Sequence, residues 1–303
     1  MSYRIRPDNA FGEDVRLLLR CLLNGAVTGL TEQPNGVHEA VHEARKKFKR
    51  IRNLYRLVGA DNKELRRQEN ARLRDAARSL SKVRDAAALI ETIDVLSAAA
   101  LNAEEEGAVA KAREALIARR DRIASSETDF QDKLSGVIDA CGAALREVDS
   151  LSLPNRPRPA ARLLAKGWKK GLVRAQTALE TCEGSGHGEA FHDLRKAAQA
   201  YWMNLSLMRG LWPSAMASKR KDAKKLVDVL GHDQDLSVLT SVLDDEPELC
   251  GDGEALSFLL AMIIRCQQQL RREALELANI VFAEPPEREA AIIATLWLEA
   301  AAG

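Results

Sequence analysis

The sequence repeats itself at a fixed spacing, and this repeat constrains the fold more than any other feature. When the chain is shifted by 150 positions against itself, the two halves align without gaps. Because the matches include both apolar and charged positions, we expect two structurally similar units. The matched pairs are Gly36 with Gly186, Glu39 with Glu189, Ala40 with Ala190, His42 with His192, Arg45 with Arg195, Lys46 with Lys196, Leu57 with Leu207, Leu80 with Leu230, Asp85 with Asp235 and Leu89 with Leu239.

The composition predicts helices. Strong helix formers such as Ala, Leu, Arg and Glu are frequent, and only 4% of the residues are aromatic. Turn signals divide the chain into amphipathic segments that are long enough for helices. The predicted segments are 9–30, 36–59, 62–99, 103–149, 159–183, 187–210, 214–245 and 253–282, followed by a last helix after Pro285 and Pro286.

The midpoint of the chain is marked by LSLPNRPRPA, residues 151–160, which contains three prolines. Because proline cannot continue a helix, this stretch predicts a linker. We therefore expect an all-α fold with one four-helix bundle in residues 1–150. A second bundle with an added C-terminal helix is expected in residues 161–303, and an approximate internal two-fold axis would relate the two.

The net charge of +1 conceals a strong segregation of charge. Residues 12–84 carry 17 basic and 9 acidic side chains, and residues 85–150 carry 7 and 14. Residues 156–235 carry 15 and 8, and residues 236–303 carry 4 and 12. Since local potential decides what a surface attracts, each half is expected to present a basic face to an anionic partner.

The first basic face lies on the predicted helix over 36–59. At 100° per residue, its cations fall within an arc of about 80° beside an apolar arc. Such a stripe is often only a solvated face. Here, however, like charges are stacked at helical spacing instead of alternating in sign, which favours binding of an anion. The stripe consists of His42, Arg45, Lys49, Arg52 and Arg56.

Other predicted helices repeat this arrangement, so each half is expected to present three basic helices to one polyanion. A flexible chain of phosphates suits such a surface, because each cation can pair with one phosphate and release a counterion. Nucleic acid is the alternative, although the face over 36–59 lacks the aromatic residues on which bases stack. The full candidate set is Arg16, Arg20, His42, Arg45, Lys46, Lys49, Arg50, Arg52, Arg56, Arg74, Arg78, Lys82, Lys166, Lys169, Lys170, Arg174, His192, Arg195, Lys196, Lys221, Lys224, Lys225 and His232.

Two sequence features could indicate other chemistry. The segment GHDQDL, residues 231–236, contains potential metal ligands, but neighbouring residues point apart on a helix and no second His or Cys follows at i+4. His42 and His192 could each be a packed core histidine, yet their shared repeat position favours contact with phosphate. We expect no metal and no cofactor.

The expected location is the cytoplasm. The five cysteines form no CxxC pair and include an odd thiol, which argues against a secreted disulfide framework. No apolar run is long enough for a membrane span, and the first residues lack the apolar core of a signal peptide.

Four segments resemble the CHAD family, the conserved-histidine α-helical domains. The family pattern of a histidine, an Arg three residues later and an Arg-rich continuation is matched by His42, Arg45, Lys49, Arg50 and Arg52. FHDLRK at 191–196 is typical, LGHDQD at 230–235 matches the LG-x-x-x-D signature, and LSKVRD at 80–85 is a variant of it. The resemblance covers nearly the whole chain.

This resemblance implies two symmetric four-helix bundles that bind inorganic polyphosphate in a basic cleft or pore, and a possible association with polyphosphate granules. It also implies no catalysis, and the chain contains no GxSxG, phosphate-loop, HExxH or Glu-x-Glu-x-Lys motif. The chain departs from the family after His192, where Gln199, Ala200 and Trp202 replace frequently basic residues. Lysines elsewhere in the second half could compensate.

Overall fold

The computed structural model describes residues 3–302, and for Ser185 the backbone alone. Helices are the only regular secondary structure among the described residues, with no strand, so the prediction of an all-α fold is confirmed. The helices are α1 (Phe11–Glu32), α2 (Val37–Val58), α3 (Lys63–Ser79), α4 (Lys82–Ser97), α5 (Ala103–Ser126), α6 (Phe130–Glu147), η1 (Val148–Ser150), α7 (Pro157–Ser185), α8 (Gly188–Leu207), α9 (Pro213–Asp245), η2 (Pro247–Cys250), α10 (Gly253–Val281) and α11 (Pro286–Ala300).

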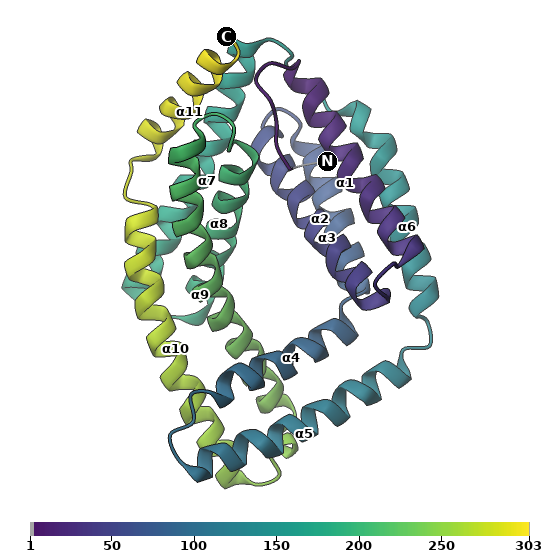
Figure 1. The fold of residues 1–303 in the computed structure, drawn as a ribbon, viewed down its shortest axis with the longest axis vertical. Coiled ribbons are helices and arrows are strands. Elements are labelled where there is room, and N and C mark those ends of the chain that lie inside the picture. Colours follow the sequence, from purple (N-terminus) through teal and green to yellow (C-terminus); the bar gives the residue numbers. More distant parts are fainter. Residues whose placement is uncertain (1–2, 303) are drawn as a thin grey trace.

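The helices enclose two separate hydrophobic cores, and each core combines helices from both halves of the chain. The larger core joins α1, α2, α3 and α6 to α7, α8 and the adjoining parts of α9, α10 and α11. The smaller core joins α4 and α5 to the remaining parts of α9 and α10. In Figure 1, α4 and α5 lie across one end of the molecule, while α1 to α3 and α7 to α9 form its two sides. The relation of two bundles by a pseudo-two-fold axis stays a prediction.

Two of the predicted single helices are each a pair of helices in the structure, so these two predictions were wrong. The segment 62–99 breaks at Leu80 and Ser81, and the segment 103–149 breaks at 127–129. Each break lies where the chain passes from one core to the other. Leu73 on α3 is buried in the larger core and Leu89 on α4 in the smaller one. In contrast, α9 and α10 pass through both cores without a break.

The predicted linker is shorter in the structure. Residues 151–156 lie outside helices, and α7 begins at Pro157. Pro157 and Pro159 occupy its first turn, where a missing N–H removes no intrahelical hydrogen bond. A proline cluster can therefore begin a helix as well as separate two domains.

Helix α2 approaches the second half of the chain closely at two points. The Asn53 side chain donates a hydrogen bond of 2.7 Å to the Asn204 side chain on α8, and both residues are buried. A Cβ atom added to Gly167 on α7 would lie 2.0 Å from the carbonyl oxygen of Leu57. These contacts fix the separation between α2 and the pair α7 and α8.

Among the described helices, none combines the length and apolarity needed to cross a membrane.

The close approach at Gly167 predicts opposite effects for two glycine substitutions on α7. Gly167→Ala should destabilise the protein by about 1–3 kcal/mol, because the new methyl group must displace the α2 backbone. Gly171→Ala, one turn further on, meets no atom within 4 Å and should stabilise by up to about 1 kcal/mol through helix propensity. Urea unfolding of both variants measures the difference. Equal effects of the two substitutions would contradict the close approach.

Candidate functional site

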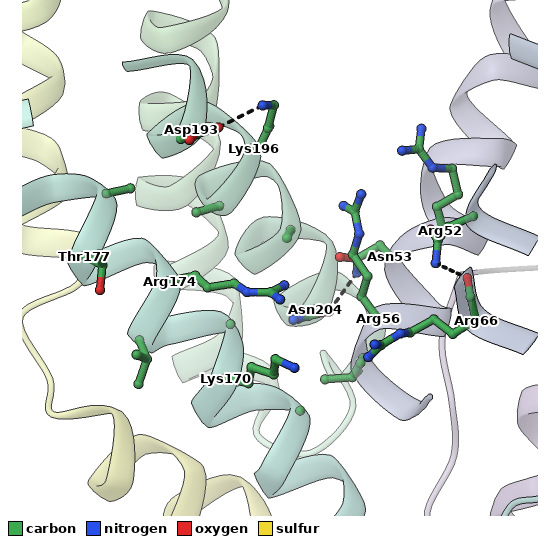
Figure 2. Close-up of a pocket in the computed structure, with 18 of the residues that line it drawn as sticks. Arg52, Asn53, Arg56, Arg66, Lys170, Arg174, Thr177, Asp193, Lys196 and Asn204 are labelled. Carbon is green, nitrogen blue, oxygen red and sulfur yellow. Dashed lines mark hydrogen bonds and ion pairs between the residues drawn. The ribbon is translucent and has the colours of Figure 1, made fainter. Parts of the chain in front are cut away.

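A cavity of about 1170 Å³ lies between α2 and α3 on one side and α7 and α8 on the other (Figure 2). Its lining is strongly basic, and the two carboxylates in it are already paired. Glu64 accepts from Arg67 at 2.9 Å, and Asp193 accepts from Lys196 at 2.8 Å. The basic residues of the lining are Arg52, Arg56, Lys63, Arg66, Arg67, Arg74, Lys170, Arg174 and Lys196.

Cations of the two walls face one another. Figure 2 shows Lys170 and Arg174 extending from α7 toward the wall that carries Arg56 and Arg66. Among residues 3–302, no carboxylate forms an ion pair with Arg56, Lys170 or Arg174, and all three side chains are exposed to solvent in the cavity. A dissolved anion can therefore reach them.

Repulsion between these cations lowers the pKa values of Lys170 and Arg56. The Arg174 guanidinium is the main cause that lowers the pKa of Lys170, and Arg66 contributes too. Partial desolvation is the main cause that lowers the pKa of Arg56, and Arg174 and Arg66 lower it further. A group of like charges lowers each member's pKa because protonation of one disfavours protonation of the others. An anion between the walls would reverse this effect.

Arg52 lies at one end of the cavity, beside a smaller cavity of about 270 Å³. Desolvation lowers the pKa of Arg52, and the guanidinium groups of Arg56 and Arg74 lower it further. Its buried Nε atom has no hydrogen-bond partner among the described residues. The smaller cavity is lined by Arg45, Phe48, Lys49, Arg52, Arg74, Ala77, Arg78, Ser81 and Asp85.

One carboxylate lies in the smaller cavity. Asp85 is 3.6 Å from Arg45, whose guanidinium also donates 2.8 Å to the carbonyl of Ala77. Desolvation lowers the pKa of Lys49, and the cations Arg195 and Arg45 lower it further. Arg195 of α8 therefore lies near this cavity although it does not line it.

The structure brings nine of the predicted site residues into the lining of the two cavities. Lys63, Arg66 and Arg67 also line the larger cavity but were missing from the predicted set. A signal for them exists in the basic run at the start of α3, although the sequence does not reveal that α3 faces α7. The predicted residues in the linings are Arg45, Lys49, Arg52, Arg56, Arg74, Arg78, Lys170, Arg174 and Lys196.

Many other predicted residues lie outside both linings and contact other groups. Arg50 lies over the ring of Tyr3, at 5.4 Å from its centroid. His192 contacts Gln234 through Nδ1, and His232 lies near Asp235. The remaining ion pairs are Arg16 with Glu13, Arg20 with Asp149, Lys46 with Glu43, Lys166 with Asp61, Lys169 with Glu287, Lys224 with Asp228 and Lys225 with Glu273.

Three further predicted residues also lie outside the linings. His42 is half-buried one turn before Arg45, and Lys221 is exposed on α9. Lys82, at the start of α4, lies near Asp129. Across residues 3–302, no group of three or more His, Cys, Asp or Glu side chains is arranged to hold a metal ion.

The repulsion across the cavity predicts a measurable coupling between Lys170 and Arg174. In Arg174→Gln, the pKa of Lys170 should rise, because the main cause that lowers it is removed. The matched change Arg162→Gln, on the same helix and outside the lining, should leave it unchanged. NMR titration of the Lys170 side chain measures both. If the pKa of Lys170 stayed the same in Arg174→Gln, the two cations would not interact.

Comparison with known proteins identifies the family of the chain. The CHAD domain model matches residues 23–244, a span that includes both walls of the cavity. A search of curated proteins gave no match. Since the matched region covers most of the sequence, the chain belongs to the CHAD domain family.

Proposed function

We propose that the protein binds inorganic polyphosphate in the larger cavity and does not cleave it. The observation that carries this proposal is the set of cations that face one another across the cavity without intervening carboxylates. Polyphosphate is the polyanion that CHAD domains are known to bind. In a cell, this binding would bring the protein to polyphosphate granules.

The chemistry of the lining suits a chain of phosphates. Guanidinium groups form charge-assisted and often bidentate hydrogen bonds with phosphate oxygens. A polyanion placed between Arg56 and Arg174 would also remove the repulsion between them. Each contact that replaces a condensed counterion contributes favourably and makes the affinity depend on salt concentration.

The lining favours polyphosphate over nucleic acid. None of the residues that the structure places in the wall of the larger cavity is aromatic, so bases would have no stacking surface there. Phe48, in the smaller cavity, is only 1% exposed because it packs in the core. The walls therefore offer contacts to a phosphate backbone and few to bases.

We propose that the protein does not cleave polyphosphate because both carboxylates in the lining of the larger cavity form ion pairs. Glu64 and Asp193 are each paired with a cation, so neither is positioned as a free base for an attacking water. Chain length measured by gel electrophoresis should be unchanged after incubation with the protein. Shortening of the chain that depended on the cavity arginines would contradict this part of the proposal.

Removal of one cation from each wall should weaken polyphosphate binding. For Arg56→Ala/Arg174→Ala, we expect at least a tenfold loss of affinity. The slope of log affinity against log salt should become shallower by roughly 0.7 for each lost contact. Titration calorimetry over a salt series measures both quantities.

The matched control is Arg120→Ala/Arg288→Ala, which removes the same charge from α5 and α11, outside both cavities. It should change the affinity little. If both double variants lost affinity equally, binding would depend on net charge and not on the cavity.

Competition distinguishes polyphosphate from nucleic acid. Long-chain polyphosphate should displace labelled single-stranded DNA or RNA at physiological salt, while excess nucleic acid should not displace polyphosphate. Fluorescence anisotropy measures the displacement in both directions. Tighter binding of nucleic acid than of polyphosphate would favour the alternative function.

A further inference from the structure

The two cavities adjoin, because Arg52 and Arg74 line both of them. Arg52 comes from α2 and Arg74 from α3, so each of the two helices supplies a guanidinium group to the passage from one cavity to the other. An anion that extends beyond the larger cavity at this point meets the guanidinium groups of Arg52 and Arg74, and it competes for Arg74 with Asp75, which is 2.9 Å from it.

A single stripe of α2 continues through both cavities. Arg56 lines the larger cavity, Arg52 lines both, and Lys49 and Arg45 line the smaller one. Their spacing of four, three and four residues keeps them on one helix face. At 1.5 Å per residue, the stripe extends about 16 Å along the helix axis.

Helix α3 supplies the opposite side of this track. Arg67 and Asn70 line the larger cavity, Arg74 lines both, and Ala77 and Arg78 line the smaller one. These positions also share one helix face, and α2 and α3 are packed neighbours joined by a short turn. The basic lining is thus elongated along α2 and α3, a shape that suits a linear polyanion better than a compact one.

The two cavities differ in how many walls contribute cations. In the larger cavity, cations from α2 and α3 are joined by Lys170 and Arg174 of α7. The lining of the smaller cavity comes from α2, α3 and the turn into α4, and it includes Asp85, close to Arg45. A carboxylate at this point repels phosphate, so the favourable track ends near Arg45.

We propose that the smaller cavity extends the polyphosphate site, so that the protein discriminates between chains by length. This inference rests on the proposed function. A short chain is bound within the larger cavity alone. A long chain passes between Arg52 and Arg74 and gains contacts with Lys49 and Arg78.

The experiment compares tripolyphosphate with size-fractionated long-chain polyphosphate on the full protein. Arg78→Ala and, separately, Lys49→Ala should weaken binding of the long chain by roughly tenfold, the effect of one charge-assisted contact. Both should leave tripolyphosphate binding unchanged. Lys170→Ala, in the larger cavity, should weaken binding of both ligands.

The control variant is Arg162→Ala, which removes an exposed cation outside both cavities and should alter neither affinity. Arg78 and Lys49 are exposed as well, so their truncation leaves the core intact, and an unchanged unfolding midpoint verifies this. Equal weakening of both ligands in Arg78→Ala and Lys49→Ala, or no weakening of either, would overturn the inference. Failure of the wild-type protein to bind either ligand would instead overturn the proposed function.

Discussion

The close packing of α2 against α7 and α8 sets the distance between the two basic walls, and the site depends on it. At Gly167, the backbones of α7 and α2 approach so closely that a methyl group has no room. Nearby, the buried pair Asn53 and Asn204 joins α2 to α8 and lies in the wall of the larger cavity. A buried amide pair favours one relative placement of two helices, since any shift would leave its polar atoms unpaired.

This packing holds like charges together, which is unfavourable for the folded state alone. The repulsion that lowers the pKa values of Arg56 and Lys170 also lowers the stability of the protein without an anion. The two hydrophobic cores offset that cost. A ligand that binds only the arranged cations would stabilise the fold by mass action. Binding strength and stability are therefore linked through the same contacts.

The sequence was sufficient to predict helices where local signals mark their ends. The run of Ser125, Ser126, Thr128 and Asp129 at the end of α5 is such a signal, and it would have located the second break. The break at Leu80 has no Pro or Gly beside it. Its cause is tertiary, because the chain leaves one core there and enters another.

The sequence identified cations on both walls, among them Arg56 and Arg174, but not which helices face one another across the cavity. The periodicity of α2 identified the stripe through Arg45, Lys49, Arg52 and Arg56, because a helix face follows from spacing alone. The same spacing would have excluded Arg50, which lies outside the arc of that stripe. The role of Arg66 could not be predicted, since it depends on how α3 and α7 are placed across the cavity, a long-range relation that no local pattern encodes.

The two repeats differ in charge at the basic positions of α2, and this difference decides along which helices the site can extend. The 150-residue offset places Gln199, Ala200 and Trp202 of α8 on Lys49, Arg50 and Arg52 of α2. Helix α8 therefore forms a largely neutral side of the larger cavity, and the second half contributes its cations mainly from α7. A polyanion held between α2 and α7 finds further cations along α2 and α3 but few along α8, although Arg74 and Arg45 are paired with Asp75 and Asp85. The extension of the site toward Arg78 follows from this imbalance of charge.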